Sequence, residues 1–162
     1  MFGKIKFLIK YCDNIVNGKT KLENDGSIVF HSSVAIEAFS LYPYHWSLEL
    51  TTKKINNKQY MIQYAMGALG LINCIQKQLK IPMSHKGRIY IDFPIPIEAD
   101  GIYYNQYAEF VEKKYFDRRN NILAIGDIET TKGVCVEFAS NQYAFINENN
   151  ELKAIYIKFD IL

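Results

Sequence analysis

The sequence predicts an α+β domain, in which a mostly antiparallel sheet carries one long buried helix and a second, shorter helix. Three observations lead to this fold class. Apolar and polar residues alternate near the start of the chain, which is typical of a half-buried strand. Apolar residues recur at helical spacing between residues 59 and 80. The last forty residues form apolar runs separated by turn-forming residues, which indicates a meander of strands.

The N-terminal region is expected to hold two short strands that pair antiparallel. Lys4–Tyr11 alternates between an apolar face and a lysine face, and Ser27–His31 is a second apolar run. Asn14–Gly26, between them, is rich in Asn, Gly, Lys and Asp and predicts a loop.

Three further elements are predicted before the long helix. Val34–Ser40 follows two serines and predicts a short helix with a serine cap. His45–Thr51 alternates as a strand, and Lys53–Lys58 predicts a turn.

The long helix is predicted over about residues 60–80, within Gln59–Lys80. Its stripe at helical spacing is accompanied by further apolar residues on the opposite side, so we expect it to lie deep against the sheet. The alternative that Tyr60–Tyr64 is a strand leading into the helix stays open. The stripe comprises Ile62, Ala65, Leu69, Ile72, Ile75 and Leu79.

The second half predicts a strand, a second helix and a meander. Arg88–Phe93 alternates as a strand before two prolines, and residues 102–116 carry aromatic residues on one helical face. The C-terminal three-stranded meander is expected at Ile122–Ile128, Gly133–Ala139 and Glu151–Asp160, with Tyr143–Ile146 extending the second strand past a bend.

Length and composition predict a single globular domain over residues 1–162. The hydrophobic fraction of 49% and the charged fraction of 22% are ordinary for such a domain. The N-terminus lacks the apolar core of a signal peptide, and no uncharged stretch makes a clean membrane span. Cys12, Cys74 and Cys135 are far apart and odd in number, which predicts reduced thiols. We therefore expect a soluble, cytoplasmic protein that makes no membrane contact.

Charge is divided unevenly between the two parts of the chain. Residues 1–90 carry 12 Lys and Arg against 5 Asp and Glu, whereas residues 91–162 carry 7 against 12. The basic residues include only three arginines, which counts against base-specific readout of nucleic acid. An acidic surface in the second part would suit a basic partner.

Signatures of catalysis and cofactor binding are missing from the sequence. There is no phosphate-binding glycine loop, no nucleophile elbow and no paired metal-ligand spacing among His31, His45 and His85. We predict a non-enzymatic protein with no cofactor, no metal, no nucleic-acid partner and no small-molecule ligand. Two alternatives stay open: a small enzyme with an unrecognised His/carboxylate site, and a nucleic-acid-associated protein that uses the lysine face of Lys4, Lys6 and Lys10.

The predicted contact residues belong to two groups, acidic side chains from the second part of the chain and tyrosines from the Tyr42–Trp46 segment. Tyrosines bury a large area at a low entropic cost, which suits an interface, whereas Trp46 is expected to pack inside. The candidate partner-binding residues are Asp92, Glu98, Asp100, Glu109, Glu112, Asp127, Glu129, Glu137, Tyr42 and Tyr44.

The chain resembles immunity proteins of bacterial polymorphic toxin systems, such as those of contact-dependent growth inhibition. The resemblance lies in the runs Ile122–Glu129, Gly133–Ala139 and Leu152–Ile157 and in a short Lys-, Ile- and Asn-rich domain without catalytic motifs. It implies a cytoplasmic protein that binds one cognate toxin C-terminal domain and blocks it by occlusion. The net charge of +2 departs from the strongly acidic immunity proteins of basic nucleases. Either the acidic residues form a local patch, or the toxin is not a basic nuclease.

Overall fold

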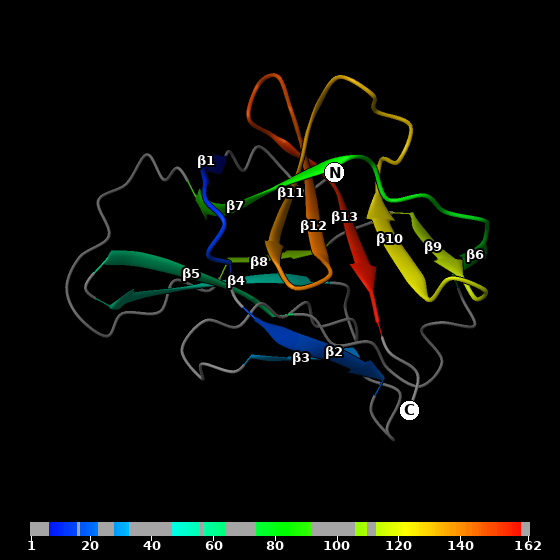
Figure 1. The fold of residues 1–162 in the computed structure, drawn as a ribbon, viewed down its shortest axis with the longest axis horizontal. Coiled ribbons are helices and arrows are strands. Elements are labelled where there is room, and N and C mark those ends of the chain that lie inside the picture. Colours follow the sequence, from blue (N-terminus) through cyan, green and yellow to red (C-terminus); the bar gives the residue numbers. More distant parts are fainter. Residues whose placement is uncertain are drawn as a thin grey trace.

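A computed structural model describes the backbone of residues 7–15, 17–22, 28–32, 47–55, 57–63, 74–91, 106–109 and 113–159. Side chains are described for 9–15, 17–21, 74–87, 89 and 113–159. This part of the chain is all-β: its regular elements are strands, and it contains no helix (Figure 1). No helix long and apolar enough to cross a membrane occurs in these ranges.

Eight strands form one mixed sheet in the order β1-β7-β11-β12-β13-β10-β9-β6. Neighbouring strands are antiparallel, except that β11 pairs parallel with β7 and β6 pairs parallel with β9. The strands are β1 (Phe7–Tyr11), β6 (Ile75–Gln76), β7 (Ser84–Ile91), β9 (Lys114–Asp117), β10 (Ile122–Gly126), β11 (Gly133–Ala139), β12 (Gln142–Asn147) and β13 (Leu152–Lys158).

The hairpins of the C-terminal strands follow from their turn residues. Asn141 and Asn150 adopt positive φ angles of 59° and 62°, a conformation that asparagine tolerates better than most residues. In the second turn, the side-chain oxygen of Asn147 accepts the backbone N–H groups of Asn149 and Glu151 at 3.0 and 2.9 Å. The side chain thus satisfies backbone groups that the turn leaves without a strand partner.

Both faces of the central strands are buried. All five residues of β10 are buried, and Val136, Ala144 and Ile155 from neighbouring strands expose 1% or less of their surface. Strands buried on both sides have continuous apolar runs, because neither face meets water. This is why β10 reads Ile-Leu-Ala-Ile-Gly rather than as a strict alternation.

One face of the sheet is covered by an irregular segment, residues 77–83, which leads from β6 across the sheet to β7 (Figure 1). Leu79 in this segment packs into a cluster with Ile122 and Tyr156, and Ile81 packs against the same cluster. The segment therefore covers the part of this face that the cluster forms, with Leu79 as its one buried residue.

Two smaller sheets lie outside the eight-stranded sheet. The first pairs β2 (Gly18–Leu22) with β3 (Ile28–Ser32), and the second has the order β5-β4-β8, with β4 (Ser47–Ile55), β5 (Asn57–Gln63) and β8 (Gln106–Glu109). Buried Gln142 donates its side-chain amide to the hydroxyl of Thr20 in β2. The Gly18 N–H also donates to the Ser140 hydroxyl at 3.3 Å, so β2 docks beside the β11–β12 turn.

The predicted α+β class is wrong for the described residues, and so is the long helix at about 60–80. Residues 57–63 form β5 and pair with β4 in continuous register, while 75–76 form β6 and 77–83 are irregular. The physical reason is that the segment is apolar on most sides. Such a run fits a buried strand as well as a helix, and pairing with other strands decides between them: 57–63 pairs with the adjacent β4, and 75–76 with the distant β9. Residues 64–73 lie outside the described part.

The second predicted helix, about 102–116, is also wrong. Gln106–Glu109 is strand β8, which pairs with β4, and Lys114–Asp117 is strand β9, which pairs with β10. Tyrosine and phenylalanine favour strands, and they are frequent in this segment. Of the residues between the two strands, 110–112 are outside the described ranges.

Two N-terminal predictions also need correction. β1 pairs with β7 rather than with the strand at 28–32, and β3 pairs with β2, which forms within the segment predicted as a loop. The composition of Asn14–Gly26 concealed a short alternating strand, Gly-Lys-Thr-Lys-Leu. The predicted short helix at 34–40 lies in the undescribed part of the chain.

The C-terminal strands form where they were predicted, but their number and order differ. Gln142–Asn147 is a separate strand, so the region has four strands rather than three. The first of them, β10, pairs with β13 and β9 instead of β11. The last strand, β13, has neighbours on both sides, which fits the burial of residues on both of its faces.

Candidate functional site

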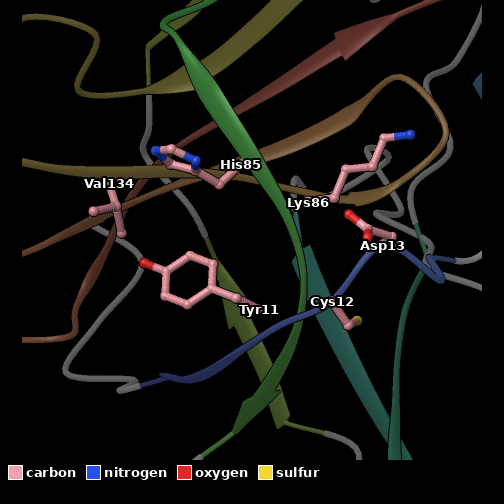
Figure 2. Close-up of a pocket in the computed structure, with 6 residues that line it drawn as sticks. All are labelled: Tyr11, Cys12, Asp13, His85, Lys86 and Val134. Carbon is pink, nitrogen blue, oxygen red and sulfur yellow. The ribbon is translucent and has the colours of Figure 1, made fainter.

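A pocket of about 570 Å³ opens where β1 ends beside β7 and β11 (Figure 2). Its chemistry is mixed, because its lining includes a phenol, a thiol, a carboxylate, an imidazole, an ammonium group and an apolar side chain. The lining residues are Tyr11, Cys12, Asp13, His85, Lys86 and Val134.

Strand register brings these residues together. The antiparallel pairing of β1 with β7 sets Tyr11 opposite Gly87, and the Cys12 N–H donates to the Lys86 carbonyl at 3.2 Å. A Cβ atom at Gly87 would lie 3.0 Å from the Lys10 carbonyl oxygen and 3.2 Å from a methyl group of Val136. Glycine therefore allows β1 and β11 to approach β7 closely at this level.

The lining side chains divide between the two sides of β7. Tyr11, His85 and Val134 lie on one side of the strand, and Cys12, Asp13 and Lys86 lie on the other (Figure 2). For Tyr11, Cys12, His85 and Lys86 this follows from strand geometry, since successive residues point to opposite faces, whereas Asp13 lies beyond the end of β1. The thiol of Cys12 and the imidazole of His85 consequently do not face each other, so the pocket does not assemble a Cys–His nucleophile and base.

Tyr11 and His85 form the aromatic side of the pocket. Their ring centroids are 6.1 Å apart and the rings are nearly perpendicular, at 86°, in an edge-to-face arrangement. Tyr11 exposes 56% of its surface, and Met83, two residues before His85, exposes 88%. Tyrosine and methionine are among the residue types that are enriched at protein interfaces.

A second polar pair lies at the opposite edge of the sheet. The parallel register of β6 with β9 sets Ile75 beside Tyr115, so buried Cys74 lies next to Lys114 in β9. Burial lowers the pKa of the Lys114 ammonium to about 8, and the nearby thiol raises it slightly. Burial also raises the pKa of the Cys74 thiol to about 11, so the thiol stays protonated near neutral pH.

Metal binding finds no support in the described residues. No three of their His, Cys, Asp and Glu side chains are grouped closely enough to hold an ion. Asp13 and His85 line the same pocket, but they lie on opposite sides of β7 (Figure 2).

Of the ten predicted contact residues, three have described side chains: Asp127, Glu129 and Glu137. Asp127 accepts the Glu129 N–H at 3.0 Å and the Thr130 hydroxyl at 2.6 Å, which closes the turn after β10. These hydrogen bonds lower the pKa of the Asp127 carboxyl. Its first role is thus to stabilise a turn.

Glu129 and Glu137 also have partners within the chain. Glu129, whose side chain is 82% exposed, lies 3.6 Å from the Lys77 ammonium, and Glu137 accepts the Asn141 N–H at 3.2 Å. The two glutamates flank opposite ends of β11, because Glu129 precedes the strand and Glu137 is near its last residues. The structure does not bring these two acidic side chains into one patch.

The other predicted contacts receive no structural placement. Glu109 belongs to β8, where only the backbone is described. The remaining positions lie outside the described residues: Tyr42, Tyr44, Asp92, Glu98, Asp100 and Glu112.

Sequence reasoning missed Tyr11 and Lys86 as lining residues of one pocket. The alternation of β1 groups Tyr11 with Ile9 and so predicts burial for both, although Tyr11 is the last residue of its strand. A signal was present in the polar sequence Cys-Asp-Asn that follows, because a strand that ends at a polar turn leaves its last side chain near solvent.

Comparison with known proteins supplies no family: a scan against protein-family models, a search of curated proteins and a search of solved structures each found no match.

Proposed function

We propose that this chain is a non-enzymatic protein that binds a partner protein. The observation that supports this is the pocket beside β1 and β7, where Tyr11 stays 56% exposed and packs edge-on against His85. Tyrosine and methionine are enriched at protein interfaces, and Met83 is exposed two residues before His85. The positively charged side chain of Lys86 also lines the pocket.

The proposed partner is the toxin domain of a bacterial polymorphic toxin or contact-dependent growth inhibition system, which this chain would neutralise in the cytoplasm by occlusion. The class comes from the resemblance of the C-terminal runs to immunity proteins. Those runs correspond to β10, β11 and β13, which make up the buried centre of the sheet. The resemblance therefore lies in the core strands, and the pocket supplies the proposed contact surface.

An enzyme is the second candidate function, and one observation supports it. Cys12, Asp13 and His85 line the same pocket, and each of these side chains can take part in catalysis. Their separation across β7 favours binding over catalysis in this conformation.

Co-expression tests the proposal and separates the two candidates. The toxin to use is the variable C-terminal domain encoded by a gene directly upstream, produced in a sensitive bacterium with and without this chain. We expect growth to recover and the two proteins to co-purify as a complex. Growth that does not recover contradicts the toxin proposal, and recovery without a stable complex favours an enzyme.

A pair of variants tests the contact surface. Tyr11→Ala removes an exposed ring and should weaken the complex by about 10- to 100-fold, as expected for an interface hot spot. Lys132→Ala, in the exposed turn before β11, is the matched control and should leave binding unchanged. Equal affinity of both variants would contradict the role of the pocket.

A further inference from the structure

The backbone of β1, the outermost strand of the eight-stranded sheet in the described part of the chain, has a definite pattern. β1 stands last in the strand order and, within the described ranges, pairs with β7 alone. The Cys12 N–H donates to the Lys86 carbonyl, in register with the β1–β7 ladder. Hydrogen-bonded and non-hydrogen-bonded pairs alternate along an antiparallel ladder. Leu8 and Lys10 therefore direct their backbone groups toward β7, whereas Phe7, Ile9 and Tyr11 direct theirs outward.

The side chains along this edge alternate in chemistry as well. Lys10 is exposed on one face of the sheet, and the register sets Lys86 diagonally from it on the same face. Half-buried Ile9 and exposed Tyr11 lie on the other face. A strand added along β1 would thus meet the Lys10 ammonium group on one of its faces and apolar surface on the other, with Lys86 one strand further away in β7.

From this pattern we infer that the partner adds an extended segment to the sheet along β1, and that this segment alternates acidic and apolar residues. The inference rests on the proposed function, since it describes how the same surface holds a protein partner. Main-chain hydrogen bonds from the outward groups of Phe7, Ile9 and Tyr11 provide the attachment. Acidic side chains beside Lys10 and apolar side chains beside Tyr11 provide the selectivity.

The charge of the edge argues for an acidic segment and against a second copy of this chain. Two β1 strands placed side by side would bring their Lys10 faces together, and a lysine on an edge strand is a common means of preventing such pairing. The carboxylates of an acidic segment would instead be attracted to the Lys10 ammonium group. The carboxylate of Asp13 lies beyond the end of β1, so it does not face the outward groups of the strand.

Hydrogen exchange followed by NMR tests strand addition directly. The probe is a ten-residue peptide of alternating Glu and Val, with blocked ends, added to the full chain. We expect the Ile9 and Tyr11 amides to exchange about tenfold more slowly with peptide, because they gain hydrogen bonds. The Leu8 and Lys10 amides, already bonded to β7, should change less than about twofold. Absence of binding, or protection without this alternation, would overturn the inference.

Two variants and a second peptide serve as controls. Ile9→Pro removes an outward N–H and should abolish the protection at Tyr11 while the β1–β7 ladder stays intact, since proline is accepted where an edge N–H faces solvent. Lys10→Glu should weaken binding of the Glu/Val peptide by about fivefold, as for an exposed ion pair, whereas Lys132→Glu should not.

The second peptide tests the preference for acidic residues: an alternating Lys/Val peptide should not bind. Equal binding of the two peptides would overturn the acidic preference.

The peptide experiment contains no toxin, so its outcome is independent of growth rescue. If the chain rescues growth but the peptide gives no alternating protection, strand addition is wrong and the immunity function stands. If the peptide binds as expected but no toxin is neutralised, the edge is a strand-binding site with another partner.

Discussion

Asp117 is a buried carboxylate that holds three parts of the chain together. Its oxygens accept the Leu79 N–H at 2.9 Å, the Arg119 N–H at 3.1 Å, and both the backbone N–H and the side-chain amide of Asn120 at 3.2 and 2.8 Å. Asp117→Asn removes the charge and should lower the free energy of unfolding at pH 7 by about 2 kcal/mol, because buried N–H groups lose a charged acceptor. Urea unfolding measures the change.

The stability lost in Asp117→Asn should depend on pH in a definite direction. The hydrogen bonds from Leu79 and Asn120 hold the pKa of the Asp117 carboxyl below its ordinary value of 3.8. The stabilisation is therefore complete above the unfolded-state pKa and is lost as the pH falls through the folded-state pKa. The difference in melting temperature between wild type and Asp117→Asn should narrow between pH 5 and pH 2. A constant difference over this range would contradict the assignment.

Gly133 begins β11 in a conformation that few other residues adopt. Its φ is +152°, and a Cβ atom there would lie 2.2 Å from the Ile146 carbonyl oxygen. Gly133→Ala should therefore lower the free energy of unfolding by roughly 2 kcal/mol or more, through backbone strain and the steric clash. Thr131→Ala, in the exposed turn before it, is the control and should change stability by less than about 0.5 kcal/mol. Equal stability of the two variants would contradict this reading.

The irregular segment 77–83 behaves as a covering element although it has no regular structure. Leu79 is 7% exposed and packs against Ile122 and Tyr156, while the Asp117 carboxylate accepts its N–H. Leu79→Ala should cost about 2–4 kcal/mol of unfolding free energy, from lost burial and the cavity left behind. Met83→Ala lies in the same segment but is 88% exposed, and should cost less than about 0.5 kcal/mol. Similar losses for both variants would show that the segment does not cover the core.

Local pattern predicted some elements well and others poorly, for a physical reason. The strands at β10, β11 and β13 are bounded by turn residues such as Asn141 and Asn150, which fix where a hairpin reverses. Residues 57–63 form a hairpin with the adjacent β4, but their apolar stripe continues at helical spacing and concealed the strand. Residues 106–109 carry no comparable local constraint and acquire strand structure by pairing with β4, more than fifty positions earlier. Pairing over the distance that separates β8 from β4 leaves no periodic trace in either segment alone.

The candidate site was hidden from the sequence for a similar reason. Tyr11 and His85 are 74 positions apart, and only the register of β1 with β7 brings their rings together. The number of charged residues in each part of the chain could be predicted from the sequence, but their positions on the folded surface could not. The acidic Glu129 and Glu137 are close in sequence, yet β11 carries them to opposite ends of a strand.

At the scale of the whole molecule, the basic and acidic parts of the sequence do not form separate basic and acidic regions of the structure. Lys86 from the basic part of the sequence and Glu137 from the acidic part are paired neighbours in the parallel ladder of β7 and β11. Lys77 and Glu129 likewise come from the two parts and lie 3.6 Å apart. Folding therefore interleaves the two charge classes, and the basic character that persists at the β1 edge is local.

The three cysteines provide probes of how the whole fold opens. Cys135 lies in β11 between β7 and β12, and burial raises the pKa of its thiol to about 12. Cys74 precedes the two-residue edge strand β6, and burial raises its pKa to about 11. Cys12 is half-buried at the pocket. Since the thiolate is the reactive form, native labelling by iodoacetamide at pH 8 should proceed in the order Cys12, Cys74, Cys135.

The differences between the three labelling rates show which parts of the sheet open locally and which open only on global unfolding. An edge strand opens locally at a lower free energy than the centre of a sheet, so labelling of Cys74 should exceed the global unfolding rate, while labelling of Cys135 should follow it. Mass spectrometry of peptides at timed intervals measures each site, and urea gives the reference in which all three react. Destabilisation by Leu79→Ala should accelerate Cys135 labelling, whereas Met83→Ala should not. Faster labelling of Cys135 than of Cys74 would contradict the central place of β11 in the sheet.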